Sequence, residues 1–232
     1  IANYWVGIDS AFVYPIVALV PMLIAYAFGP ELYASTWLSM VMVLNAVAFG
    51  FVTEWGRARG RTGAAWWWLA FVFLLGPIAL GRIDSVTVAL AIVGVLLIAR
   101  APQAAVVVLA VATWIKVWPA ALLGAAVIAL RGRLRIVAVA LVTSAVIMAV
   151  AVAIGSGANL FSFITEQTAR GLQIEAPIST GWLWRAAGGD PSTFVYYDQQ
   201  ILTFQVSGPG VDLVATLLTP LLALAALAVC FL

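Results

Sequence analysis

A single lysine lies where a charge is costly. Lys116 belongs to the segment Trp114-Ile115-Lys116-Val117-Trp118-Pro119 and has apolar residues on both sides. An ammonium group in such surroundings is unfavourable unless it meets an anion or a cavity. Binding of an anionic lipid phosphate satisfies this requirement. The alternatives are that the Lys116 side chain extends to a membrane surface or pairs with a carboxylate.

The densest group of polar residues lies between residues 165 and 177. Arg170 carries a planar guanidinium group that matches the oxygens of a phosphate. Gln173 and Glu175 have the donors and acceptors to bind sugar hydroxyls, and the Glu175 carboxylate can also direct a proton. A solvated loop with local salt bridges explains the same residues, and this alternative stays open.

Two aspartates are further candidates. Asp9 precedes Phe12-Val13-Tyr14-Pro15 and is a candidate catalytic carboxylate, with a turn at a membrane interface as the simpler explanation. Asp84 lies in Gly81-Arg82-Ile83-Asp84-Ser85, a turn between two apolar stretches, where capping of the following helix is enough to explain it.

The missing residue types limit the chemistry. The sequence has no histidine, which excludes imidazole bases, Ser-His-Asp and Cys-His systems and histidine-ligated metals. The single cysteine, Cys230, excludes an internal disulfide and a thiolate metal cluster. Acid–base chemistry must therefore use carboxylates, lysine or tyrosine, and we expect neither a metal nor a cofactor. A formal charge of +2 gives no indication of a nucleic-acid partner.

The composition predicts the elements that hold these residues. Hydrophobic residues make up 65% of the chain and charged residues 9%, too few to cover a water-soluble surface. Since backbone groups in hydrocarbon must be paired internally, long apolar runs become helices. The sequence therefore predicts an all-α integral membrane protein, a polytopic helical bundle.

Seven apolar stretches approach the ~20 residues that a helix needs to cross ~30 Å of hydrocarbon. The predicted division is a transmembrane module (1–154), an extracytoplasmic loop (155–210) and a further transmembrane helix (211–232). Within the loop, residues 159–169 are expected to form a short helix on the membrane surface. The chain begins without methionine and stops inside an apolar run, so we expect it to be incomplete at both ends. The predicted spans are 13–28, 33–52, 64–80, 85–99, 103–130, 136–154 and 211–232.

The orientation depends on the stretch 103–130. Cytoplasmic loops are rich in arginine and lysine, and the basic clusters lie at 57–61, at Arg100 and at 131–135. If all three are cytoplasmic, 103–130 enters and leaves on one side as a re-entrant hairpin broken near Pro119. If it spans once, the first two clusters lie opposite the third. Both arrangements place the loop 155–210 outside.

Several of these segments, in order along almost the whole chain, resemble the GT-C glycosyltransferases, and specifically the bacterial polyprenol-phosphate-mannose-dependent α-(1→2)-mannosyltransferases. The resemblance rests on four segments: Phe12-Val13-Tyr14-Pro15, the Gly81 to Asp84 turn where relatives often have Gly-Gln-X-Asn, Lys116-Val117-Trp118-Pro119, and Arg170-Gly171-Leu172-Gln173-Ile174-Glu175.

The resemblance implies sugar transfer, with mannose expected, from a polyprenyl-phosphate donor to a lipid-linked or glycan acceptor. The reaction would occur at the outer face of the bacterial plasma membrane, with inversion at the anomeric carbon. It implies a general base upstream of Ile1, leaving Asp9 and Glu175 as candidates within this chain. Arg170 and Lys116 would bind the donor phosphate, and Gln173, Glu175, Tyr14 and Asp84 the sugar or acceptor. It also favours a single span for 103–130.

Two other functions remain as hypotheses. A transporter or flippase of lipid-linked substrates would use Lys116 inside a pathway and would need no catalytic carboxylate. An assembly or scaffold subunit would show neither sugar transfer nor transport of a lipid-linked substrate, and it would be purified with a stable partner.

Overall fold

A computed structural model describes residues 4–57, 59–168, 171–199, 201 and 203–230. The protein is mostly helical and divides into two compact units, residues 1–163 (unit 1) and 164–232 (unit 2). Helix α9 (Ser162–Thr168) crosses the boundary between them.

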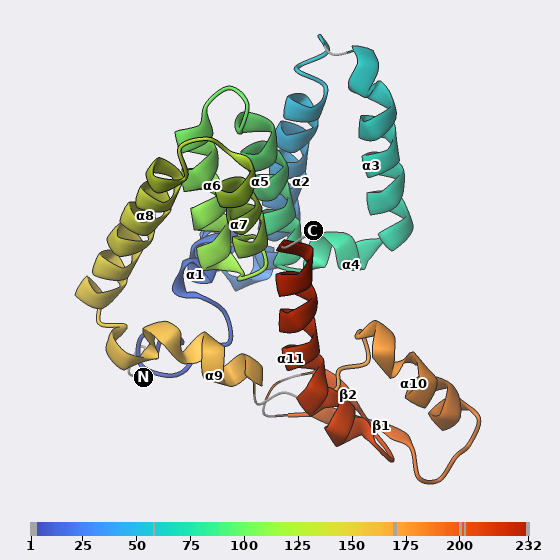
Figure 1. Cartoon of the computed structure of the whole chain (residues 1–232). Coiled ribbons are helices and arrows are strands. Elements are labelled where there is room, and N and C mark those ends of the chain that lie inside the picture. The colour runs from blue at the N-terminus through green and yellow to red at the C-terminus, as the bar shows by residue number, and fades with distance from the viewer. Residues whose placement is uncertain (1–3, 58, 169–170, 200, 202, 231–232) are drawn as a thin grey trace. The chain divides into compact units, whose positions relative to one another are not determined.

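Unit 1 is a bundle of helices centred on α5 and α6 (Figure 1). Helix α5 packs against α2 and α6, and α6 also packs against α8. The elements of unit 1 in chain order are η1 (Ile16–Ala18), α1 (Leu19–Tyr26), η2 (Pro30–Leu32), α2 (Tyr33–Val52), η3 (Arg59–Arg61), α3 (Thr62–Leu75), α4 (Pro77–Gly81), α5 (Asp84–Leu97), α6 (Pro102–Ile115), α7 (Ala120–Ala129), α8 (Arg133–Ala153) and η4 (Gly157–Phe161).

The prediction of seven spans is wrong. Within the described residues, two helices are long and apolar enough to cross a membrane, Pro30–Val52 and Arg133–Ala153. The other apolar helices are shorter; α3, α5 and α6 have 14 residues each, or ~21 Å at 1.5 Å per residue. Glycine and proline divide the apolar runs. At Gly76, for example, the backbone turns to a φ of 64°, and Pro77 then begins α4.

The stretch 103–130 is a helical hairpin. Helix α6 ends at Ile115, Lys116 is extended, and α7 begins after Pro119. The start of α6 lines the same pocket as Arg131, which follows α7, so the chain returns to the end where it began. The preference for a single span is therefore wrong, and the re-entrant alternative describes the path of the chain. Proline lacks the N–H that would continue α6 and disfavours helical backbone in the residue before it.

The hairpin gathers the basic clusters at one end of unit 1. The Arg100 guanidinium lies 2.9 Å from the Glu54 carboxylate, and Arg61 lies 3.4 Å from the same oxygen. Figure 1 shows the loops after α2 and α5 at the same end as the start of α8. We name this the arginine end; it comprises Arg57, Arg59, Arg61, Arg100, Arg131, Arg133 and Arg135. The opposite end, where α5 begins and α6 finishes, is named the lysine end.

The core of unit 1 is built from small residues and a few large ones. Ala18, Ala25 and Val41 are fully buried there, and Trp37 packs beside them. A Cβ atom at Gly94 would lie 2.7 Å from the Leu109 side chain, so α5 and α6 approach closely at this point.

The outward faces of the two long helices are apolar and uncovered. Met42 and Val43 on α2 are 64% and 62% exposed, and Leu141 and Val142 on α8 are 64% and 63% exposed. A core helix of a water-soluble protein would have such residues covered.

Unit 2 contains a β-hairpin, so the all-α prediction is also wrong. Strand β1 (Phe194–Asp198) pairs antiparallel with β2 (Thr203–Ser207). The sequence Phe-Val-Tyr-Tyr is rich in aromatic and β-branched residues, which favour strands. The other elements of unit 2 are η5 (Pro177–Ser179), α10 (Thr180–Ala187) and α11 (Val211–Cys230).

The predicted loop 155–210 has structure of its own. Its first part belongs to unit 1 and the remainder to unit 2. Residues 157–168 form η4 followed by α9, so the expected short helix is present over the described residues, and its location on a membrane surface stays a prediction. Within it Phe161 and Ile164 are 50% and 53% exposed.

Candidate functional site

The centre of the lysine end is an ion pair. Lys116 Nζ donates a hydrogen bond to Asp84 Oδ2 at 2.5 Å, and their side chains are 26% and 35% exposed. The pairing joins the first residue of α5 to the residue that follows α6. Lys116 therefore pairs with a carboxylate, which was one of the alternatives predicted from the sequence. Helix α5 places Asp84 in its first turn, where a negative charge is favoured by the helix dipole.

Three further side chains complete this end. Arg82 Nε lies 3.8 Å from the same Asp84 oxygen, and the Tyr14 ring centroid lies 6.0 Å from Lys116 Nζ. Trp118 donates a hydrogen bond from Nε1 to Thr87 Oγ1 at 3.2 Å, which anchors the turn after Lys116 to α5. The structure therefore brings together three of the predicted site residues, Tyr14, Asp84 and Lys116.

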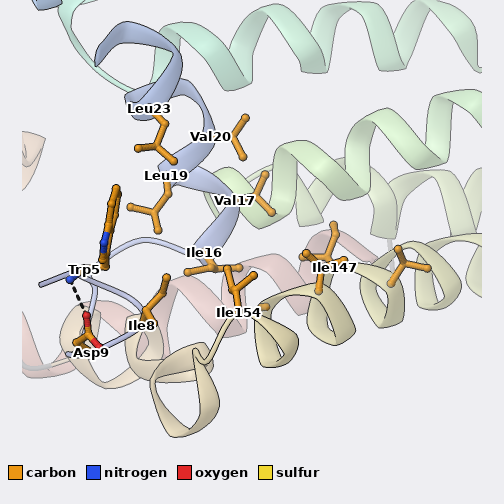
Figure 2. Close-up of a pocket in the computed structure, with 13 residues that line it drawn as sticks. Trp5, Ile8, Asp9, Ile16, Val17, Leu19, Val20, Leu23, Ile147 and Ile154 are labelled. Carbon is orange, nitrogen blue, oxygen red and sulfur yellow. Dashed lines mark hydrogen bonds between the residues drawn. The ribbon is translucent and has the colours of Figure 1, made fainter. Parts of the chain in front are cut away.

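An apolar groove of about 660 Å³ lies between the N-terminal segment and α8 (Figure 2). One wall comes from η1 and α1, with Ile16 and Leu19, and the other from α8, with Ile147, and from Ile154 directly after it. Asp9 is its one ionisable lining residue among the described positions. The Asp9 Oδ2 atom accepts a hydrogen bond from the Trp5 backbone N–H at 2.8 Å. Asp9 is a turn residue, as expected, and also a carboxylate on an apolar groove.

Three polar side chains that were not predicted as site residues hold the segment with Asp9 in place. Ser156, which is 1% exposed, donates a hydrogen bond to the Gly7 carbonyl at 2.5 Å, and Asn159 donates one to the Ile8 carbonyl at 2.7 Å. Ser162 Oγ accepts a hydrogen bond from the Phe12 backbone N–H at 2.9 Å. These contacts connect residues about 150 positions apart in the chain. The available signal was the group of small polar residues directly after the apolar run 136–154.

The candidates of the second predicted segment lie in unit 2. Gln173 pairs through its backbone with Gln205 on β2, and the Ile174 N–H donates a hydrogen bond to the Phe204 carbonyl at 3.2 Å. Glu175 is exposed. Arg170 lies outside the described residues. The structure thus holds Gln173 at the edge of the β-hairpin and leaves its predicted role in sugar binding as a prediction.

Unit 2 also contains a carboxylate that sequence reasoning did not single out. Asp190 accepts hydrogen bonds from the side chain and the backbone N–H of Ser192, and it pairs with Arg185 at 2.7 Å. These bonds stabilise the charged form, chiefly through Ser192, and lower the pKa of Asp190 to about 2. A carboxylate held so firmly in its charged form is poorly suited to act as a base at neutral pH.

The described residues contain no group of three or more carboxylate or thiol side chains that could hold a metal ion. What the lysine end and the groove offer are a carboxylate on an apolar wall, a cation fixed by a second carboxylate, and a tyrosine. No family model, no curated protein and no solved structure matches the chain in comparisons with known proteins.

Proposed function

We propose that the protein is embedded in a membrane, with α2 and α8 crossing it. The proposal rests on the length of these helices and on their uncovered apolar faces. The arginine end then lies on the cytoplasmic side, because cytoplasmic segments near spanning helices are rich in arginine. The lysine end, with Asp9, faces the extracytoplasmic side of the bacterial plasma membrane.

We further propose that the protein is a glycosyltransferase that takes a sugar, mannose by the resemblance, from a polyprenyl-phosphate donor. The observation that carries this proposal is the apolar groove with Asp9 as its ionisable lining residue. An isoprenoid chain needs an uninterrupted apolar channel, and the reaction at its end needs a base. Such a groove, with few polar groups placed in it, is the usual form of a site for a largely apolar ligand.

In this reaction Asp9 accepts the proton of the acceptor hydroxyl. The hydroxyl oxygen then forms a bond to the anomeric carbon, and the bond from that carbon to the phosphate oxygen breaks. Polyprenyl phosphate leaves with the electron pair and needs a cation to stabilise it. Lys116 has three N–H donors, of which Asp84 uses one, so it can also bind a phosphate. Arg170, which is the first predicted cation for this role, lies outside the described residues and stays a prediction.

The test uses the full chain in proteoliposomes with radiolabelled polyprenyl-phosphate mannose and a membrane lipid extract as acceptor. Asp9→Asn keeps the acceptor atom for the Trp5 N–H but removes the base, and we expect transfer to fall by about 10²-fold or more. Asp212→Asn, an exposed aspartate in the first turn of α11, is the matched control and should retain transfer. Unchanged transfer by Asp9→Asn would remove this residue from the reaction.

Arg170→Ala tests the predicted phosphate site in the same assay, with abolished transfer and normal expression expected. Movement of the labelled lipid across the bilayer without chemical change would instead support the hypothesis of a transporter or flippase. Inertness of the wild-type protein in both measurements would contradict the proposed transfer.

A further inference from the structure

A second pocket lies at the arginine end, away from the groove with Asp9. Its volume is about 200 Å³, and it is lined by the beginning of α6 and by the segment that joins α7 to α8. Arg131, Arg135 and Gln103 supply exposed polar side chains, whereas Val106 and Ile136 in the same lining are buried. The pocket therefore combines two cations and an amide with an apolar interior.

Over the residues that the structure describes, the arginines of this pocket have no acidic partner. Glu54 pairs with Arg61 and Arg100, but no described residue forms an ion pair with Arg131 or Arg135. Helix α8 has no acidic residue in its first turn and instead begins with Arg133 and Arg135. Helix α6 also begins at this pocket, again without an acidic residue. The partial positive charge of a helix N-terminus favours anions, so cations placed there raise the positive potential further.

We propose that this pocket binds an anionic glycerophospholipid from the cytoplasmic leaflet. Its phosphate accepts hydrogen bonds from Arg131, Arg135 and Gln103, and the upper part of an acyl chain contacts Val106 and Ile136. Basic pockets between helices on the cytoplasmic side are the usual place for such headgroups. The inference rests on the membrane orientation proposed above but not on glycosyl transfer.

The experiment measures lipid binding to the full chain in a neutral detergent by native mass spectrometry, with thermal stability as a second readout. Dioleoyl phosphatidylglycerol is the probe, and dioleoyl phosphatidylcholine and inorganic phosphate are the comparison ligands. We expect retention of phosphatidylglycerol and a rise in melting temperature with it, and neither with phosphatidylcholine or phosphate. Sugar transfer is not involved, so failure here is distinguishable from failure of the proposed reaction.

Paired variants locate the site. Arg131→Gln with Arg135→Gln should weaken phosphatidylglycerol binding about tenfold or more, because both charge-assisted hydrogen bonds are lost. Arg57→Gln with Arg61→Gln removes the same charge from the same end outside the pocket and should leave binding within about twofold. Arg131→Lys with Arg135→Lys keeps the charge and should retain most of the binding, which also reports that substitution here leaves the protein folded.

Three results would overturn the proposal: equal binding by the glutamine pair and the wild type, equal retention of the two lipids, or stabilisation by inorganic phosphate alone to the same extent. The last result would identify an anion site that does not recognise a lipid.

Discussion

The two ends of unit 1 each contain an ion pair in a different setting. At the arginine end, Glu54 contacts Arg100, whose side chain is 71% exposed, in a loop among several other arginines. At the lysine end, Asp84 contacts Lys116, whose side chain is 26% exposed, and this pair ties the beginning of α5 to the end of α6. The interaction is chemically similar, and each carboxylate has a second cation nearby, Arg61 for Glu54 and Arg82 for Asp84. The difference is that the Lys116 side chain is shielded from water far more than the Arg100 side chain.

The difference assigns the two ends different functions. A surplus of exposed cations sets the orientation of the protein in the proposed membrane. It also attracts anions over a distance of about 8 to 10 Å at physiological salt. At the lysine end, Asp84 is the one carboxylate partner of the partly shielded Lys116 among the described residues, so removing Asp84 leaves this cation unpaired at the junction of α5 and α6. Substitutions that remove one partner at each end should therefore give unequal effects.

The largest effect is expected for Asp84→Asn. It leaves the Lys116 charge without its carboxylate partner, and we expect the free energy of unfolding in detergent to fall by about 1–3 kcal/mol, below the value for a fully buried pair because both groups are partly exposed. Chemical denaturation of the purified protein measures this change.

Glu54→Gln is the matched substitution at the arginine end. It should lower the free energy of unfolding by less than about 1 kcal/mol. The double substitution Asp84→Asn with Lys116→Met should recover part of the lost stability. Equal costs for Asp84→Asn and Glu54→Gln would refute the difference between the two ends.

A loss of stability similar to that of Asp84→Asn is expected for Ser156→Ala, which removes the buried hydrogen bond to the Gly7 carbonyl. A buried acceptor left without a donor costs about 1–3 kcal/mol, and here the loosened segment carries Asp9. Hydrogen exchange should increase at residues 5–10 while α5 and α6 stay protected.

Ser39→Ala is the control for Ser156→Ala, since Ser39 donates its hydrogen bond within its own helix, to the Ser35 carbonyl. Unchanged exchange at residues 5–10 in Ser156→Ala would show that other contacts hold Asp9 in place.

The smallest effect concerns Asp190, an exposed pair in unit 2 that serves as a reference for both ends. Its pKa is lowered to about 2, below the ordinary value of an aspartate. The stabilisation from its hydrogen bonds is therefore present above about pH 4 and disappears as the pH falls through about 2.

Carboxyl carbon NMR should show the Asp190 midpoint near pH 2, with the signal of the Ser192 amide following the same transition. Replacement of Ser192 by alanine should move the midpoint upward, because Ser192 contributes most to the shift. A midpoint near the ordinary aspartate value in the unsubstituted protein would show that these bonds do not persist in solution.

Much of the fold followed from local sequence. Apolar composition and the scarcity of charge predicted the helical class, and α2 and α8 begin and end within a few residues of the stretches 33–52 and 136–154. The short helix near 159–169 was also predictable. These features depend on composition and on neighbours in the chain, which a sequence states directly.

The number of spans depended on where the chain turns back, which local sequence does not state. One apolar run became a single long helix at 136–154, whereas another became two short helices at 103–130, where Lys116 and Pro119 interrupt the run. Hydropathy alone does not reveal whether the chain turns back at such a point, because a broken helix inside a bundle satisfies its free backbone groups with neighbours.

By itself, the sequence determined which residue types the chain contains, where the cations lie along it and that most of it is helical. Tertiary structure alone decided that Lys116 meets Asp84, that Asp9 lines an apolar groove and that the basic clusters share one end. The physical reason is that an ion pair or a groove is made by residues from separate helices. Their distances depend on where the chain reverses, and those reversals depend on the packing of the whole bundle.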